Sequence, residues 1–323
     1  DALNAIYQAT WQMAEETGGE QHERFLSYLH RIQDEDLTLG VAMTDGKGDR
    51  SKRPGDQAVI DAYVHITERN ANGIVISGVK AIVTGGPYMH ELLVMPCRTM
   101  RKEDADFAVC CALPIDAKGL TIISRPAGRP GEAEAAFSAK YGQSVAVCHF
   151  DQVFVPWDQV FFAGESDYTE HLVTSYANHH RHSCIGARAG FGDLLIGAGA
   201  LMTEANGLDM EAVPHLRDSM AELIKLVEGF FACGVAASVY GVEDPCGSWM
   251  PEPVFSNVGK LLLATQIYDM HRIAHEVSGG LIVALPGPDE DHNPATSGDL
   301  ATLLAGRADI PYDQRAQVAR FLG

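Results

Sequence analysis

Two short polar segments rich in glycine carry the residues with the clearest potential for chemistry. Residues 42–50 read AMTDGKGDR and offer a soft apolar side chain, a hydroxyl and several charges, on Met43, Thr44, Asp45, Lys47, Gly48, Asp49 and Arg50. Residues 84–86 follow a β-branched run and form the turn Thr84, Gly85 and Gly86. Glycine lets a backbone approach a ligand closely and adopt positive φ angles, so we predict that the two turns together hold a flat, phosphate-bearing cofactor. An ordinary surface loop is the alternative for each, because neither matches a dinucleotide fingerprint or a P-loop.

A histidine cluster in YANHHRHSC is the densest set of candidate metal ligands, comprising His179, His180, His182 and Cys184. On a helix, His180 and Cys184 lie at i and i+4 and share a face. Imidazole and thiolate at that spacing suit a soft metal or an iron–sulfur cluster. A cluster needs four ligands, so its other ligands would have to come from elsewhere. The alternative is that these histidines are surface residues or polar contacts within a helix bundle.

Two further charged groups are candidates for a site. His90 and Glu91, just after the TGG turn, suit an acid/base pair or a cofactor contact, with a surface pair at a strand entry as the alternative. Arg50, Lys52 and Arg53 form a basic spot in an acidic protein. Such a spot suits a phosphate, a carboxylate or a reduced-flavin anion, and a solvated loop is the alternative.

The composition limits the class of protein. The chain has 323 residues, of which 46% are hydrophobic and 21% charged, and a net charge of −19; this is a globular composition with length for about two domains. An acidic surface repels phosphate backbones, so we expect no nucleic-acid partner. No apolar run approaches the ~20 residues of a membrane span, so we expect no membrane partner. Seven cysteines without a CxxC spacing favour a reducing cytoplasm over a disulfide framework.

Helical texture at both ends flanks a central β module. We predict helices over 1–16 and 20–34, then short strands over 62–67, 73–83, 92–95, 107–113, 120–124 and 144–150, with a strand end and exit turn over 153–160. Antiparallel strands at this spacing predict a small barrel or sandwich. Residues 166–206 predict one long helix or two stacked ones, whose glycines allow close helix contact, and further helices are predicted over 213–240, 255–277, 301–305 and 312–322. Gly279 and Gly280 end the helix over 255–277, either as a plain C-cap or as a close backbone approach to a ligand.

Seven segments resemble, in this order, the flavoproteins grouped as 4-hydroxyphenylacetate 3-hydroxylase and 4-hydroxybutyryl-CoA dehydratase: AMTDGKGDR, GIVISGVKAIVTGG, MHELLVMP, DFAVCCALPIDAKGL, FDQVFVPWDQVF, HHRHSCIGARAGFGDLLIGAGAL and GGLIVALP. The resemblance covers most of the chain and implies an α+β, acyl-CoA-dehydrogenase-like fold. That fold has N-terminal helices, a middle antiparallel β-barrel and a C-terminal four-helix bundle, which we place at residues 1–40, 41–162 and 163–323. The family also implies FAD between barrel and bundle, and a homotetramer.

In detail the sequence resembles the dehydratase branch more. In that branch the loop corresponding to residues 43–50 and the turn corresponding to residues 84–86 hold FAD, and a [4Fe–4S] cluster is bound by three cysteines and one histidine. His180 matches the histidine, but Ala187 replaces the helix cysteine, and Cys184 stands where the branch has a tyrosine credited with catalysis. We therefore expect the cluster to be absent or altered, with His180 and Cys184 as metal ligands only if one is present.

The resemblance predicts an FAD-dependent oxidoreductase that hydroxylates a phenolic substrate with reduced flavin and O₂, the flavin being reduced by a separate reductase. Arg50 would contact flavin or substrate, Thr84 would hydrogen-bond the flavin ring, and His180 would act as an acid/base or a substrate anchor. His90 and Glu91 are further catalytic candidates. Two alternatives stay open: a 4-hydroxybutyryl-CoA dehydratase or vinylacetyl-CoA isomerase that acts on an acyl-CoA, and a catalytically inactive flavin-binding protein.

Overall fold

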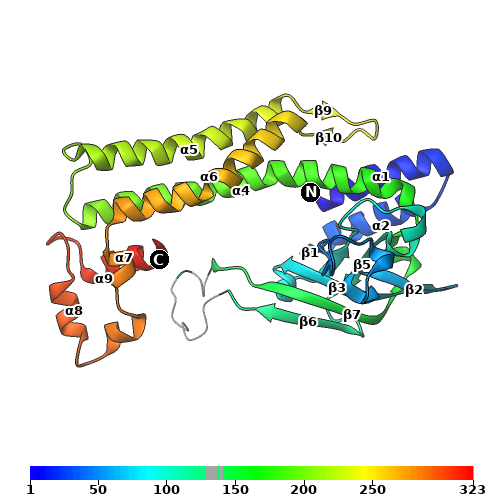
Figure 1. Ribbon diagram of the computed structural model, residues 1–323, viewed down its shortest axis with the longest axis horizontal. Coiled ribbons are helices and arrows are strands. Elements are labelled where there is room, and N and C mark those ends of the chain that lie inside the picture. Colours follow the sequence, from blue (N-terminus) through cyan, green and yellow to red (C-terminus); the bar gives the residue numbers. More distant parts are fainter. Residues whose placement is uncertain (128–136, 138–140, 323) are drawn as a thin grey trace. The chain divides into compact units, whose positions relative to one another are not determined.

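The predicted order of helices, β module and helices is confirmed by a computed structural model, which describes residues 1–127, 137 and 141–322 (Figure 1). The chain divides into two compact units. The first comprises residues 1–127, 143–180 and 242–250, and the second comprises residues 128–142, 181–241 and 251–323. The three domain boundaries predicted above stay a prediction.

Two four-stranded sheets form the centre of the first unit. One sheet has the order β1-β4-β5-β8, with bounds Leu39–Ala42, Glu91–Val94, Val109–Pro114 and Val160–Ala163. The other has the order β2-β3-β7-β6, with bounds His65–Asn70, Gly73–Thr84, Val145–Pro156 and Leu120–Arg125. Neighbouring strands are antiparallel except β1 and β4, which run parallel with Leu39 opposite Glu91.

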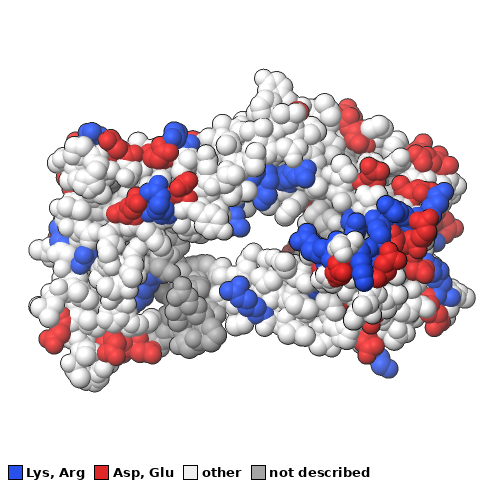
Figure 2. Space-filling model, viewed as in Figure 1, with Lys and Arg blue, Asp and Glu red and all other residues white. Residues whose placement is uncertain are grey.

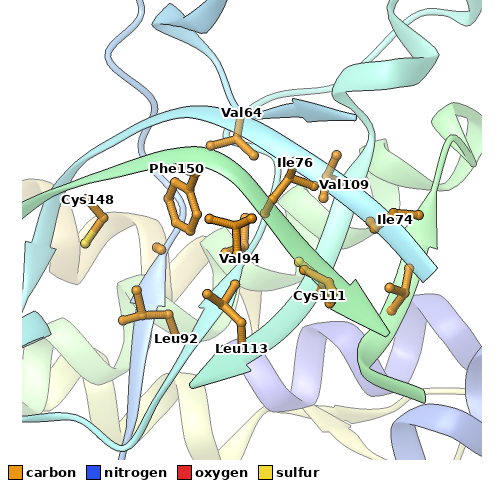
Figure 3. Packing of buried hydrophobic residues seen from close by; sticks show 14 of the residues in the cluster. Val64, Ile74, Ile76, Leu92, Val94, Val109, Cys111, Leu113, Cys148 and Phe150 are labelled. Atoms are coloured by element: carbon orange, nitrogen blue, oxygen red, sulfur yellow. The ribbon is translucent and has the colours of Figure 1, made fainter. Parts of the chain in front are cut away.

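The two sheets enclose one apolar core. Successive side chains of a strand point to opposite faces, and in both sheets the inward set is branched or aromatic. Figure 3 shows Val94 and Leu113 of the first sheet converging with Ile76 and Phe150 of the second. The thiol of Cys111 lies in the same core, and burial raises its pKa to about 12. The alternation of inward and outward side chains along the strands thus produces a sandwich-like module of two sheets.

Two N-terminal helices cover the outer face of the first sheet. They are α1 (Ala2–Thr17) and α2 (Gln21–Asp34), and both carry an apolar stripe. Ile6, Phe25 and Tyr28 pack against Phe161 of β8 in a second buried cluster. The hairpin β9 (Val242–Glu243) and β10 (Trp249–Met250) is tied to α1 by a 2.7 Å hydrogen bond from Gln8 Nε2 to Ser248 Oγ. Short 3₁₀ helices are η1 to η7: Pro54–Asp56, Ile60–Ala62, Gly86–Tyr88, Lys102–Phe107, Trp157–Gln159, Ser166–Tyr168 and Pro288–His292.

Long helices build the second unit. We predicted either one long helix or two stacked ones after residue 166, and the structure has a single helix, α4 (Thr169–Ala205). Its residues from 181 onward belong to this unit. The helices α5 (Pro214–Val239) and α6 (Pro253–Ser278) lie side by side (Figure 1). Three shorter helices follow: α7 (Leu281–Ala284), α8 (Ser297–Leu303) and α9 (Tyr312–Leu322). Ile185, Leu223, Phe230 and Met270 centre the core of this unit.

Glycines of α4 serve its packing in part. A side chain at Gly192 would collide with Val227 of α5, so this glycine permits the close helix contact that we predicted. Gly186, Gly190 and Gly197 have no neighbouring atom of the described residues within 4 Å of where a side chain would begin. The prediction therefore holds for Gly192 and not for these three.

Several strand predictions need correction. Strands β1 and β8 were not predicted, because four residues between polar segments give too short a pattern. The predicted strand over 144–150 and the predicted strand end before the turn at Pro156 form one continuous strand, β7. The pairing of β1 with β4 is parallel, whereas all strands were predicted antiparallel.

One described helix, over residues 166–205, is long and apolar enough to span a membrane by length and composition. The sequence prediction of no such run relied on uninterrupted apolar residues, and this helix carries Arg188 and Asp193. Isoleucine, leucine, methionine and alanine residues raise its mean hydropathy to 1.3 over 18 residues. Core helices of bundles pass the same test.

Candidate functional site

The two predicted glycine turns share one cleft in the first unit. Its volume is about 480 Å³, and Thr44 from one turn and Thr84 from the other both line it. The remaining lining residues come from β1, β3, α4 and the start of the chain: Asp1, Leu39, Val41, Met43, Ile82, Tyr176 and His180. We call this the threonine cleft. Its walls are mainly apolar, with three hydroxyls, one imidazole and the carboxylate of Asp1, which suits a flat ring that has polar edges.

Backbone hydrogen bonds hold the first turn against β3. The amide of Ala81 donates to the carbonyl of Thr44 over 2.8 Å, and the amide of Gly46 donates to Val79 over 3.3 Å. Asp45 and Lys80 face each other as an isolated antiparallel bridge. The loop therefore continues the second sheet by a short extra pairing, and this pairing places Thr44 beside the end of β3.

A buried ion pair lies directly beneath this loop. Lys80 Nζ is 2.7 Å from Asp45 Oδ1, and both side chains are almost fully buried. The ammonium also donates to the carbonyls of Met43 over 3.0 Å and Met95 over 2.7 Å, so its three N–H donors are all used. Asp45 accepts a further bond from the amide of Val64. Asp45, predicted to contact a cofactor, is thus engaged by the fold itself.

An exposed isoleucine in a strained backbone conformation projects into the threonine cleft. Ile82 has φ = 66° and is 67% exposed. It lies at a break in register between Ala81 and Val83, where β3 carries a bulge opposite β7. A β-branched residue with positive φ is a genuine outlier, and bulges are common beside active sites, where they redirect a side chain. The fold thus retains a strained, solvent-facing apolar group in this cleft.

His180 reaches the same cleft from α4. Its ring stacks on Tyr176 with centroids 5.3 Å apart, and its Nδ1 lies 3.3 Å from Asp1 Oδ2. Cys184, one turn further along α4, packs against the apolar core of the second unit. Nowhere in the described part of the chain do three His, Cys, Asp or Glu side chains gather to hold a metal. His180 and Cys184 alone therefore do not provide the donor set of an iron–sulfur cluster.

The other two histidines of this cluster have separate environments. His182 Nε2 lies 2.9 Å from Ser238 Oγ and 3.2 Å from the carbonyl of Gly234, both on α5. His179 is buried. The alternative of polar contacts within helices thus describes His182.

A second cleft, of about 360 Å³, has no lining residue in common with the threonine cleft. It is lined by Lys47, Arg50, Tyr63, Cys97 and Arg98, and we call it the cationic cleft. Burial raises the pKa of the Cys97 thiol, and the nearby carboxylate of Asp45 adds to this effect. Figure 2 shows Lys and Arg side chains gathered over the unit that contains the sheets, with acidic side chains among them.

The predicted basic spot is divided in the structure. Arg53 is paired with the buried carboxylate of Asp104, and Lys52 lies 4.0 Å from Asp49. Arg50 alone of the three lines the cationic cleft. The cation cluster of the cleft thus differs in membership from the predicted one.

His90 and Glu91 each contact a different residue of the fold. His90 Nδ1 accepts a 2.9 Å bond from the amide of Thr38, and Glu91 lies 2.6 Å from Arg31. Burial raises the pKa of Tyr28, and the Glu91 carboxylate beside it contributes. Neither residue is among those that line the two clefts. Their catalytic role stays a prediction, and the structure gives each of them a partner that stabilises the fold.

The predicted glycines have structural reasons of their own. Gly48 has φ = 48° and leaves room for the side chain of Gln57, which bonds the amide and carbonyl of Asp49. Gly85 has φ = 72°, and Gly86 begins η3 against Ala146. Gly279 caps α6 with φ = 80°, and Gly280 precedes α7, both in the second unit. Contact of these glycines with a cofactor stays a prediction.

Sequence reasoning missed Ile82, Lys80, Tyr176 and Arg98. Ile82 and Lys80 lie in a β-branched run that predicts an ordinary strand, and nothing local marks the bulge. Tyr176 lies one helical turn before His180, and that spacing is the signal that could have identified it. Arg98 follows Cys97 directly after β4, at the kind of strand end where binding residues gather.

The chain is similar to known proteins along its whole length. The profile described as 4-hydroxyphenylacetate 3-hydroxylase N terminal matches residues 1–162, and the C terminal profile of the same family matches residues 169–323. The chain is 33% identical to the 4-hydroxybutyryl-CoA dehydratase/vinylacetyl-CoA-Delta-isomerase of Clostridium aminobutyricum, over 100% of this chain and 68% of that protein.

Solved structures agree with this result. An oxygen-tolerant archaeal 4-hydroxybutyryl-CoA dehydratase from N. maritimus superposes with a TM-score of 0.92 at 34% identity, covering 99% of this chain and 65% of that one. The oxygenase component of 4-hydroxyphenylacetate 3-monooxygenase complexed with FAD superposes with a TM-score of 0.85 at 23% identity, covering 99% and 67%. The chain thus spans about two thirds of the length of these relatives, and the expected acyl-CoA-dehydrogenase-like fold is confirmed.

Proposed function

Because the chain belongs to the 4-hydroxyphenylacetate 3-hydroxylase family, we propose that it is an FAD-dependent enzyme whose flavin ring occupies the threonine cleft. The observation that carries this proposal is the convergence of both predicted turns on that cleft, through Thr44 and Thr84. The solved oxygenase component with FAD has the same fold, which supports the assignment of the cofactor.

The residues of the threonine cleft fit a flavin. Val41, Met43 and Ile82 offer an apolar surface for the ring, and the hydroxyls of Thr44 and Thr84 can bond its polar edge. A bound flavin supplies electron transfer and, when reduced, reaction with O₂. His180, whose imidazole lies in the cleft lining stacked on the phenol of Tyr176, is a group that can hold or move a proton there.

We propose hydroxylation of a phenolic or aromatic substrate as the reaction. The family profile that covers both halves of the chain supports it. Such an enzyme uses flavin that a separate reductase has reduced, and that reductase is the proposed protein partner. A cytoplasmic location is proposed with it, because seven free cysteines require a reducing compartment.

A dehydratase or isomerase acting on a hydroxyacyl-CoA is the second candidate. It is favoured by the 33% identity to such an enzyme along the whole of this chain. The described residues contain no group of three His, Cys, Asp or Glu side chains that could hold a metal, and Ala187 stands where that branch has a cluster cysteine. No step of the proposal therefore passes through a cluster.

The visible spectrum of the full-length protein, purified without oxygen, tests the proposal. We expect flavin absorption that is lost on Thr84→Val substitution, together with O₂ uptake and a catechol product when reduced FAD and 4-hydroxyphenylacetate are added. A protein that binds no FAD overturns the proposal. Broad iron–sulfur absorption and turnover of 4-hydroxybutyryl-CoA would favour the second candidate.

We also propose the homotetramer that the family resemblance implies. Large apolar side chains are exposed along α5 and α6 of the second unit, including Phe231, Val235 and Leu261, which are 44%, 47% and 63% exposed. Apolar surface of this extent commonly marks an interface. Sedimentation at micromolar concentration tests it: the native chain should form tetramers, and Leu261→Glu should lower the assembly state.

A further inference from the structure

A single buried ammonium joins three segments that lie far apart in the sequence. Lys80, on β3, is 2% exposed, and its Nζ lies 2.7 Å from Asp45 Oδ1. The same nitrogen donates to the carbonyl of Met43 over 3.0 Å and to that of Met95 over 2.7 Å. An ammonium has three donors, and a lysine is almost never fully buried unless it is paired. These three bonds therefore allow the charge to remain inside the fold.

The ammonium joins two walls of the threonine cleft. One wall is β1 with the turn that follows it, which carries Thr44, and the other is the end of β3, which carries Thr84. These two strands belong to different sheets. Lys80 lies on β3 itself, and two of its partners, Met43 and Asp45, flank Thr44 in the turn. The placement of the two threonines relative to each other thus depends in part on this nitrogen.

Three consecutive carbonyls, those of residues 42–44, are each bonded to a different partner. Their donors, in chain order, are the amide of Met95 over 3.1 Å, the ammonium of Lys80 over 3.0 Å and the amide of Ala81 over 2.8 Å. The first and the last donor belong to the backbone, and the middle donor belongs to a side chain. The middle bond is therefore the one that a substitution can remove while the backbone donors on either side stay in place.

Stability alone gives a weak reason for a buried ion pair. Taking two charges out of water is costly, and apolar side chains of similar volume often give equal or greater stability. An apolar pair would offer no donor to the carbonyls of Met43 and Met95 and no acceptor to the amide of Val64, which donates to Asp45 over 3.0 Å. A fully bonded polar network of this kind makes the structure around it more rigid. Neither Lys80 nor Asp45 lines the threonine cleft, so the pair can act on a ligand there only through the backbone.

We propose that Lys80, held by Asp45, is a positioning residue for the flavin. By bonding the carbonyl of Met43, it keeps the turn in the conformation in which Thr44 and Thr84 reach the same ring. This inference rests on the proposed function, because it takes the threonine cleft as the place of the flavin ring. Without the ammonium the turn would also occupy other conformations. The apparent affinity for FAD would then fall in proportion to the fraction of molecules that can still bind it.

Two destabilised variants of the full chain, compared with each other, test this role. Lys80→Ala removes the ammonium, and Leu113→Ala removes apolar contacts in the core between the sheets, at a residue that lines neither cleft. Urea unfolding measures the loss of stability in each variant. Lys80→Met, which retains more of the side chain, takes the place of Lys80→Ala if that variant does not fold.

Flavin fluorescence measures the FAD affinity of both variants, and visible circular dichroism at saturating FAD reports on the surroundings of the bound ring. We expect Lys80→Ala to bind FAD about 10-fold more weakly, as for a turn that is competent about one time in ten, and to alter the dichroism of the bound flavin. Leu113→Ala should retain the native affinity and the native dichroism, although it too is less stable than the native chain.

Added n-propylammonium provides a second measurement on Lys80→Ala. This ion supplies the atoms that the substitution removes beyond Cβ, and its N–H groups can bond the two carbonyls. We expect it to restore FAD affinity in Lys80→Ala. Tetramethylammonium, a cation without N–H donors, should not restore it, because the proposed role needs directed hydrogen bonds as well as a charge.

Three results would overturn the inference. Equal weakening of FAD binding in Lys80→Ala and Leu113→Ala would show that the buried pair acts on stability alone. Native affinity in Lys80→Ala would show that the turn needs no ammonium, and restoration by tetramethylammonium would show that directed bonds are not required. The proposed function is tested separately by the native chain: if that chain binds no FAD, the proposed function fails before any variant is compared.

Discussion

At the scale of single residues, Ile82 shows how strain and exposure indicate a ligand site. Its φ of 66° and its 67% exposure are both unfavourable for a β-branched apolar residue. Neither feature helps the free fold, and both are accounted for if a flavin ring covers the side chain. A substitution of Ile82 therefore distinguishes an effect on stability from an effect on flavin binding more clearly than a substitution of Thr44 or Thr84 does.

Replacing this residue by glycine should have opposite effects on stability and on binding. Ile82→Gly relieves strain of about 1 kcal/mol, so the free energy of unfolding should stay level or rise. Flavin affinity should fall about 10-fold, because apolar contact worth about 1.5 kcal/mol is lost. Urea unfolding and flavin fluorescence measure the two quantities.

An exposed isoleucine on another strand of the same sheet is the matched control. Ile123 of β6 is 61% exposed and its backbone has no positive φ. Ile123→Gly should therefore lose about 0.5–1 kcal/mol of stability and leave flavin affinity unchanged. Equal behaviour of the two variants would refute the strain argument.

At the scale of elements, the glycines of α4 differ in what surrounds them. Gly192 meets Val227 of α5, whereas Gly190 has open space. Alanine favours a helix over glycine by about 1 kcal/mol, but forcing a methyl group into a packed contact costs about 1–3 kcal/mol. Replacing glycine by alanine is thus expected to stabilise the protein at position 190 and to destabilise it at position 192.

Thermal unfolding of Gly190→Ala and Gly192→Ala checks this difference. We expect a midpoint that is equal or higher for Gly190→Ala and lower for Gly192→Ala. Helical content by circular dichroism serves as the control for both variants. A higher midpoint for Gly192→Ala would show that α4 and α5 are packed less closely than the structure has them.

Elements with strong local patterns were predictable from the sequence. The helix over Tyr312–Leu322 has the predicted bounds, and the strand from Gly73 extends only one residue beyond them. Strand β1 was not predictable, because its four residues pair with a segment about fifty positions away. The same limit applies to Lys80: in a strand pattern a lysine indicates a solvent-facing position, and only tertiary contact with Asp45 buries it.

The candidate site was predictable to a similar degree. Glycine and polar residues identified both turns, and the structure brings Thr44 and Thr84 to one cleft. The division of the basic spot was not predictable, since it depends on the ion pair between Arg53 and Asp104, which lie far apart in the chain. Residues that meet only through the fold leave no local signal.

At the scale of the whole molecule, buried thiols make the stability of the fold depend on pH. Burial raises the pKa of Cys111 to about 12 and that of Cys148 to about 11, whereas a thiol in the unfolded chain has a pKa of about 8.5. A folded pKa above the unfolded one means that the contribution to stability is complete below about pH 8.5. It is then lost progressively as the pH rises toward the folded values.

The free energy of unfolding should therefore fall between pH 9 and pH 11. Urea titrations across this range measure it, and Cys111→Ala serves as the comparison. That variant should be less stable at pH 7, because it leaves a cavity, but it should lose less stability with rising pH. Parallel slopes for the two proteins would show that other groups cause the alkaline loss.

The ammonium of Lys80 holds the carbonyl of Met43, a residue of the threonine cleft, and the carbonyl of Met95, two residues before Cys97 of the cationic cleft. A shift of this single nitrogen would move both carbonyls together. Occupancy of one cleft would then change the affinity of the other, and thermodynamic linkage makes that effect equal in both directions. Ligands bound in the two clefts would thus report on each other's presence without touching.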